Sequence, residues 1–240
     1  MAAVHCGHME LLQTPDFWIG LVKILWINII LSGDNAVVIA LAARTLPPHQ
    51  QNKAVFWGSG AAVVLRIMLT VVAAKLLALP YLQIAGGVLL LWIGVQLLGD
   101  EDDEEKGEAK PHASLLSAIR TILIADVVMS LDNVIAVAAA AQGSTALLIL
   151  GLAISIPLVI FGATLMVKLM ERLPVIVTAG AVLIGWVAGE TIVSDAVFAD
   201  LLAGNHWLHY VGALAGALIV FAFGKILQAR MRLQQNVAKP

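Results

Sequence analysis

Seven long runs of apolar residues dominate this sequence and constrain its fold more than any other feature. They cover residues 17–42, 54–79, 81–98, 114–141, 146–170, 175–193 and 208–227. A helix that crosses a bilayer needs about 20 mainly apolar residues, which each run approaches or exceeds. The runs are continuous, whereas the strands of a membrane barrel give weaker, alternating segments of about ten residues. We therefore expect an all-α integral membrane protein with seven transmembrane helices.

Composition supports this fold class. Charged residues make up 12 % of the chain and the mean hydropathy is +0.94, whereas soluble domains carry about 25 % charged residues. No basic stripe with interleaved aromatic residues occurs, so nucleic acid is not an expected partner. The single cysteine, Cys6, excludes a disulfide or a cysteine-based metal site within one chain. Residues 1–16 lack the basic and apolar pattern of a cleavable signal, so we expect the first run to remain as a span.

Basic residues gather on alternate connections between the runs, which is the pattern that sets orientation. They are Arg44, Lys53, Lys106, Lys110, Lys168, Arg172, Arg230, Arg232 and Lys239. The opposite side carries mainly acidic residues. We therefore predict a bacterial inner-membrane protein with its N-terminus outside and its C-terminus in the cytoplasm. The longest cytoplasmic connection, residues 99–113, is rich in acids and is interpreted as a solvated linker or as a cation-collecting or regulatory segment.

The two halves of the chain, residues 17–98 and 114–193, repeat one pattern. Ser32-Gly33-Asp34-Asn35 corresponds to Ser130-Leu131-Asp132-Asn133, and Asn28 and Asp126 precede these motifs at equal distances. Leu79-Pro80, Trp92 and Gln96 correspond in the same way to Leu173-Pro174, Trp186 and Glu190. Each half has three spans, so the second must enter the membrane from the opposite side. We predict an inverted 3+3 repeat with residues 208–227 as a seventh, C-terminal helix, all in one domain.

The acids Asp34 and Asp132 lie inside apolar spans, where a charged acid costs about 2.5–3.5 kcal/mol. A cation bound between the repeats would compensate both charges; neutralisation by Arg66 and Lys23, or by protons, is the alternative. The residues that we predict to bind the cation offer oxygen ligands. They are Asp34, Asn35, Asp132, Asn133, Asn28 and Asp126. Such oxygen ligands suit Mg²⁺, Ca²⁺ and Mn²⁺.

Three further residues refine this hypothesis. Gly33 predicts a local break in the first helix, which would let the adjacent Asp34 and Asn35 side chains converge. Met129 offers a softer thioether ligand that would favour manganese over calcium, although ordinary packing is the simpler interpretation. Glu190 is a third acid inside a span, interpreted as a gate, a proton carrier or an interfacial residue. The Gly and Ala content of the third, sixth and seventh spans predicts close helix packing.

The paired motifs resemble those of the TerC-type membrane protein family. The resemblance rests on residues 30–36 and 130–134, extends to residues 86–96, and covers about residues 17–195. It implies a seven-helix transporter of the lysine-exporter-like superfamily that exports manganese, with an older link to tellurite resistance. The family's Asp-Asn pairs carry over to Asp34 and Asn35 and to Asp132 and Asn133. A plastid branch of the family assists membrane-protein insertion, which keeps a function without transport open.

The expected function is export of a divalent cation, Mn²⁺ first and Ca²⁺ second, in exchange for protons. Moving a divalent ion outward against 100 mV costs about 4.6 kcal/mol. No nucleotide-binding motif is present to supply this energy, and no enzyme is expected. One alternative is a membrane scaffold or insertion factor. An amino-acid exporter is another, but it lacks an evident paired site for ammonium and carboxylate groups. The sequence leaves the oligomeric state open, a homodimer included.

Overall fold

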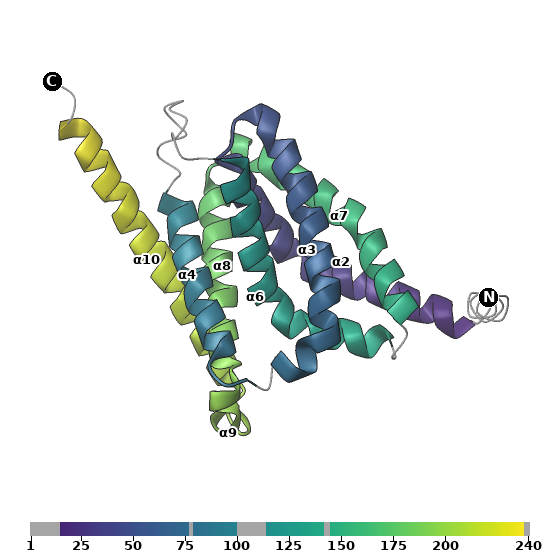
Figure 1. Ribbon diagram of the computed structural model, residues 1–240. Helices are drawn as coiled ribbons and strands as arrows, with labels where there is room; N and C mark the ends of the chain where they lie inside the picture. Colours follow the sequence, from purple (N-terminus) through teal and green to yellow (C-terminus); the bar gives the residue numbers. More distant parts are fainter. Residues whose placement is uncertain (1–14, 77–78, 100–113, 142–144, 238–240) are drawn as a thin grey trace.

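The computed structural model describes residues 15–76, 79–99, 114–141 and 145–237 (Figure 1). Within these ranges the chain is helical and forms no strand. The long helices are α2 (Pro15–Arg44), α3 (Pro48–Leu76), α4 (Leu82–Gly99), α6 (Leu115–Ala141), α7 (Thr145–Arg172), α8 (Val175–Val193) and α10 (Trp207–Val237). A 3₁₀ helix, η1 (Ala196–Phe198), and a short helix, α9 (Ala199–Leu202), connect α8 to α10. The acidic residues 100–113 of the predicted loop lie outside the described residues.

Each predicted span coincides with one of these helices, and two of the helices extend well beyond their apolar runs at one end. α3 begins at Pro48 rather than at residue 54, and α10 continues to Val237 rather than ending at residue 227. Proline is well suited to the first helical position because its missing N–H would have no partner there. Hydropathy marks only the part of a helix that lies in the bilayer, so polar first or last turns escape it.

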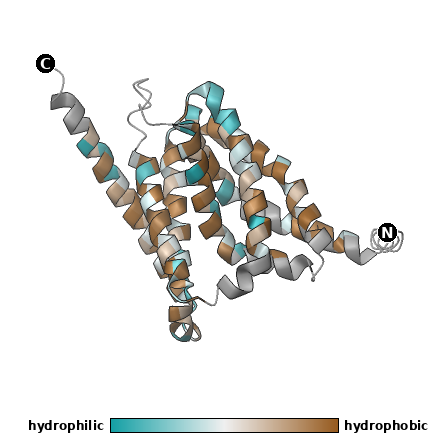
Figure 2. Ribbon diagram, viewed as in Figure 1, coloured by the Kyte–Doolittle hydropathy of each residue, from teal (hydrophilic) through white to brown (hydrophobic). Residues whose placement is uncertain are grey.

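Five helices of the described chain are long and apolar enough to cross a membrane. They are α3, α4, α7, α8 and α10. Apolar residues run along the helices in Figure 2, and large apolar side chains face outward, such as Phe161 with 70 % of its surface exposed. Monomeric soluble proteins rarely expose such extensive apolar surface, so these helices define a multi-pass membrane protein. The membrane crossings of α2 and α6 remain predictions.

The helices pack as one bundle whose centre is apolar (Figure 1). α2 packs against α7 and α6, α3 packs against α6 and α7, and α4 packs against α8. α10 covers α8 and α4 at one side of the bundle. The main core cluster takes buried residues from α2, α3, α4, α6, α7 and α8, and a second cluster around Ile24 and Leu152 lies nearer the start of α2.

Glycines bring α8 and α10 into backbone contact, which confirms the close packing predicted from their composition. Each helix carries two glycines four residues apart, Gly185 and Gly189 on α8 and Gly212 and Gly216 on α10. A Cβ added at Gly189 would lie 2.0 Å from the Gly212 carbonyl oxygen, and one at Gly216 would lie 2.1 Å from that of Gly185. Such small-residue contacts drive association in lipid, where the hydrophobic effect gives no help.

Asp195 fastens the end of α8 to the beginning of α4. Its Oδ2 accepts hydrogen bonds from the backbone N–H groups of Gln83 at 3.0 Å and Ile84 at 3.2 Å. Its Oδ1 accepts from the N–H groups of Tyr81 and Val197, both at 3.0 Å. Burial raises the pKa of this carboxyl group, but the four N–H donors outweigh it and leave the pKa below its ordinary value. Asp195 thus caps two helix starts with one charge.

The break predicted at Gly33 is absent, because α2 is a continuous helix through residues 33–35. Its backbone groups have no water to bond inside a bilayer, so the internal helical hydrogen bonds are retained there. Adjacent residues of such a helix point about 100° apart. The side chains of Asp34 and Asn35 therefore cannot converge by the route predicted from the sequence.

Candidate cation site

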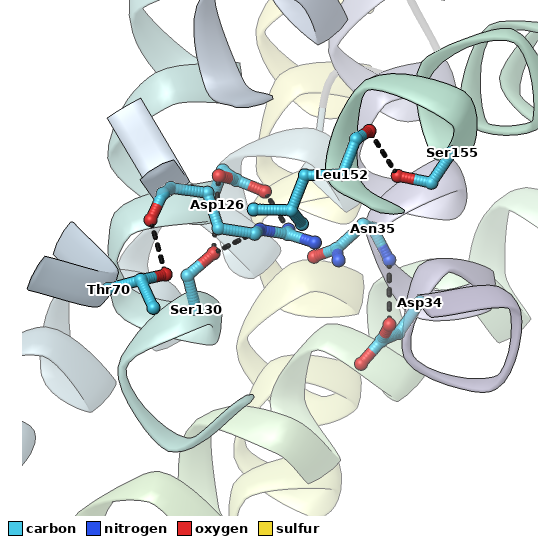
Figure 3. Close-up of polar contacts among 8 residues, drawn as sticks. Asp34, Asn35, Thr70, Asp126, Ser130, Leu152 and Ser155 are labelled. Carbon is cyan, nitrogen blue, oxygen red and sulfur yellow. Dashed lines mark hydrogen bonds and ion pairs between the residues drawn. The ribbon is translucent and has the colours of Figure 1, made fainter. Parts of the chain in front are cut away.

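A buried ion pair between Arg66 of α3 and Asp126 of α6 forms the centre of the polar site (Figure 3). Arg66 Nη2 donates to Asp126 Oδ1, and Arg66 Nε donates to Ser130 Oγ at 3.0 Å. Ser130 Oγ in turn donates to Asp126 Oδ2 at 3.2 Å. Arg66 and Asp126 are each only 6 % exposed and Ser130 is fully buried. Both Asp126 oxygens are therefore engaged.

Asp34 and Asn35 of α2 supply the second part of the site. Asn35 is buried, Asp34 is half-buried, and Asp34 Oδ1 accepts a hydrogen bond of 2.8 Å from the Asn35 N–H. Asp34 lies within electrostatic range of both Arg66 and Asp126. Figure 3 shows the labelled Asn35 between Asp34 and the Asp126–Ser130 pair. The site therefore joins residues of α2, α3 and α6.

The site lies deep in the bundle. Asp34 stands ten residues before the end of α2 at Arg44, and Asp126 stands eleven residues after the start of α6 at Leu115. At about 1.5 Å per residue, both are about 15 Å from these helix ends. In the predicted membrane crossing of α2 and α6, that distance corresponds to about half of a hydrocarbon core about 30 Å thick. Charged groups at this depth need partners, and they are a hallmark of ion and proton pathways.

The helical register of α6 places part of the predicted ligand set on one face. Asp126, Ser130 and Asn133 stand at intervals of four and three residues, the spacing of neighbours on one helix face. Asn133 is half-buried. The side chains of Asp132 and Asn28 lie outside the described part of the structure, although their backbones belong to α6 and α2. Their predicted roles stay predictions.

The solvent exposure of the other candidate residues shows which of them lie at the buried site. Lys23 is exposed on α2, so it is not placed to neutralise the buried acids. Arg66, by contrast, is buried and pairs with Asp126 rather than with Asp34. Glu190 is exposed near the end of α8, as an interfacial residue would be, and does not lie among the buried site residues. Met129 is buried in the core cluster.

The charges of the described site are unequal in number. Asp34 and Asp126 carry two negative charges when both are ionised, and Arg66 carries one positive charge. Among the described residues no cluster of three or more His, Cys, Asp or Glu side chains could hold a metal alone. A cation at Asp34 would therefore use amide, hydroxyl or backbone oxygens, or residues outside the described set, beside the carboxylate. Such mixed oxygen sites suit hard divalent ions.

Two features escaped the reasoning from sequence. Arg66 and Asp126 are 60 residues apart, and nothing in either span identifies the other as its partner. Asp195 was visible only as one of several acids on the less basic side. Its local bond to Val197 follows the common Asp turn pattern, but its bonds to α4 span more than 110 residues and leave no sequence signal.

The fold and the buried charges define a multi-pass membrane protein with an ionisable site inside its helical bundle. Comparison with known proteins gives the family. Residues 13–232 match the Integral membrane protein TerC family. The chain belongs to this family, as the paired Asp-Asn motifs indicated.

Curated relatives support this membership. The "Uncharacterized membrane protein YjbE" of Bacillus subtilis is 47 % identical over 180 residues, which are 75 % of this chain and 82 % of that protein. "Uncharacterized membrane protein YceF" of the same organism is 23 % identical over 92 % of this chain and 88 % of its own length. The "UPF0053 inner membrane protein YoaE" of Escherichia coli is 31 % identical over 53 % of this chain, but only 28 % of YoaE is covered. No solved structure matches.

Proposed function

We propose that this protein exports a divalent cation, with Mn²⁺ as the preferred ion, in exchange for protons across the bacterial inner membrane. The observation that carries the proposal is that the half-buried Asp34 lies within electrostatic range of an Arg66–Asp126 pair that is already neutral. A charge on Asp34 at that depth calls for a further cation. Family membership favours transport as the general role.

We propose Asp34 as the main ligand, with Asn35 contributing where its side chain or backbone oxygen can reach the ion, and Asp132 and Asn133 as their counterparts in the second repeat. We propose that Asp126 is a conditional ligand rather than a permanent one. Because Arg66 and Ser130 engage its two oxygens, Asp126 can bind a cation only after Arg66 has moved away. We infer that Arg66 and the transported cation compete for Asp126, so that arrival of one favours release of the other.

The helix contacts support an inverted repeat of α2–α4 and α6–α8. The contact of α2 with α7 is matched by that of α3 with α6, and the contact of α2 with α8 is matched by that of α4 with α6. Equivalent helices also touch one another, since α2 packs on α6 and α4 on α8. In such an architecture, rocking of one repeat against the other exposes a central site to each side in turn.

Proton exchange would supply the energy. Carrying a divalent ion outward against 100 mV costs about 4.6 kcal/mol, and two protons moving inward cancel the charge transferred. A carboxylate can hold either a metal ion or a proton, so Asp34 and Asp132 can alternate between the two. The basic side, with Arg44 and Lys53, would face the cytoplasm with the C-terminus, and the N-terminus would lie outside.

Flux into liposomes tests this function. Purified protein is reconstituted, and uptake of Mn²⁺, Ca²⁺ and Mg²⁺ is followed with an enclosed indicator dye. Saturable Mn²⁺ uptake, faster than Ca²⁺ uptake, is the expected result. Folded protein that moves none of these ions would overturn the proposal. An anomalous scattering peak for Mn²⁺ beside Asp34 would identify the site independently, whereas a peak confined to residues 100–105 would argue against it.

The second candidate, a membrane scaffold or insertion factor, makes the opposite prediction for the acids. If it is correct, Asp34→Ala and Asp132→Ala leave cellular metal content and metal tolerance unchanged. Exporter function predicts that both variants accumulate the metal and lose tolerance. Comparing the variants in cells at matched expression separates the two functions.

A further inference from the structure

An apolar groove opens on the outer face of the bundle between α3, α6 and α7. It has a volume of about 580 Å³, within the 300–1,000 Å³ common for small-molecule sites. Its lining includes Trp57, Gly60 and Met68 of α3, Leu123 of α6 and Ile160 of α7. Trp57 and Met68 are each 62 % exposed. A ligand in this groove would thus lie beside lipid rather than inside the protein.

The groove has the depth of one lipid leaflet. From Trp57 to Met68 it follows eleven residues of α3, or about 16 Å at 1.5 Å per residue. Half of a hydrocarbon core about 30 Å thick is about 15 Å. Trp57 lies at the shallow end of the groove, which is the end nearer the start of α3. It follows the polar first turns of α3 by about one turn, at the headgroup level that amphipathic aromatic residues favour.

Two exposed cations flank this shallow end. Lys53 precedes Trp57 by four residues and therefore lies on the same face of α3. Arg120 precedes Leu123 by three residues on α6. The two helices run level here, because a Cβ at Gly58 would lie 2.7 Å from Ile122 Cδ1. Positive charge from both helices therefore stands where a lipid headgroup would be.

We propose that this groove is a binding site for an anionic phospholipid. One acyl chain lies along Gly60 and Val64 of α3, and the phosphate and headgroup charge meet Lys53 and Arg120. Basic residues at the membrane surface attract anionic lipids with about 1 kcal/mol each, which is about fivefold in affinity. The zwitterionic lipids of the same leaflet fill the groove less well because they carry no net charge. This proposal does not depend on transport.

Quenching of Trp57 by brominated lipids tests the proposal. Purified protein and its Trp57→Phe variant are reconstituted in phosphatidylcholine with equal fractions of either brominated phosphatidylglycerol or brominated phosphatidylcholine. The difference between the two proteins isolates the signal of Trp57 from the other tryptophans. We expect phosphatidylglycerol to associate several-fold more strongly, with about a fivefold loss in Lys53→Gln and again in Arg120→Gln. Lys53→Arg should keep the preference.

Two variants complete the test. Gly60→Leu places a side chain in the groove, where an added Cβ has open space, and should lower quenching by both lipids. Arg230→Gln removes an exposed cation from α10, on the far side of α8, and should change nothing. Equal quenching by both lipids overturns the proposal, as does an equal effect of Arg230→Gln. Shielding of Trp57 from both lipids, with cross-linking between copies at Met68→Cys, would instead make this face a dimer interface.

Discussion

Arg66 on α3 and Asp126 on α6 form a buried ion pair that also shares the hydroxyl group of Ser130. The pair links the first half of the chain to the second inside the helical bundle. Because Arg66 neutralises Asp126 and not Asp34, it leaves the Asp-Asn motif of α2 as the unbalanced charge of the described site. The pair thus distinguishes Asp126, which a cation of the protein already neutralises, from Asp34, which we propose binds the transported cation.

Removing one partner of this pair should cost more stability than removing both. Arg66→Leu leaves Asp126 buried without its cation, and such a loss costs about 3–5 kcal/mol. The double variant Arg66→Leu/Asp126→Leu should recover much of that loss, because no unpaired charge remains. Equilibrium unfolding in mixed detergent micelles measures both, with Arg230→Leu as the exposed control. Additive effects of the two single variants would show that the pair is not coupled.

Asp195 should give the bundle an acid-sensitive contact. Its folded-state pKa is lowered, so its contribution to stability is present above the ordinary value of 3.8 and is lost as the pH falls through the lower folded value. Asp195→Asn removes the charge from two helix caps and should cost about 1–2 kcal/mol at neutral pH. Comparing the acid unfolding profiles tests this: the wild type should lose its advantage over the variant on acidification. A difference that stays constant with pH would exclude the charged cap.

The contact between α8 and α10 should depend on Gly216. A Cβ there would lie 2.1 Å from the Gly185 carbonyl oxygen, so Gly216→Ala forces the helices apart and should cost about 1–3 kcal/mol. Gly60→Ala is the matched control, since an added Cβ at Gly60 meets nothing and alanine favours a helix by about 0.5–1 kcal/mol. In detergent, the midpoint of thermal unfolding should therefore fall in Gly216→Ala and rise in Gly60→Ala. Equal shifts would mean that the close approach contributes nothing.

Hydropathy alone predicted where the helices lie, because the bilayer requires continuous apolar helices. Composition also predicted the tight packing that Gly189 and Gly216 provide. The predicted break at Gly33 was wrong, because glycine permits a break without requiring one. Partners such as Arg66 and Asp126, or Asp195 and Gln83, could not be predicted, since they depend on which helices pack together. The repeat predicted which acids are candidate ligands, but it could not show that Arg66 already neutralises Asp126.

Transport driven by a pH gradient alone tests the central claim most directly. Liposomes containing the protein are clamped to zero voltage with K⁺ and valinomycin, and Mn²⁺ movement is recorded after a pH step in each direction. We predict that Mn²⁺ moves in the direction opposite to the protons. Asp34→Asn and Asp132→Asn should abolish this movement, and folded Arg230→Gln should retain it. Mn²⁺ flux that ignores the pH step, or Asp34→Asn protein that transports at the wild-type rate, would contradict the account.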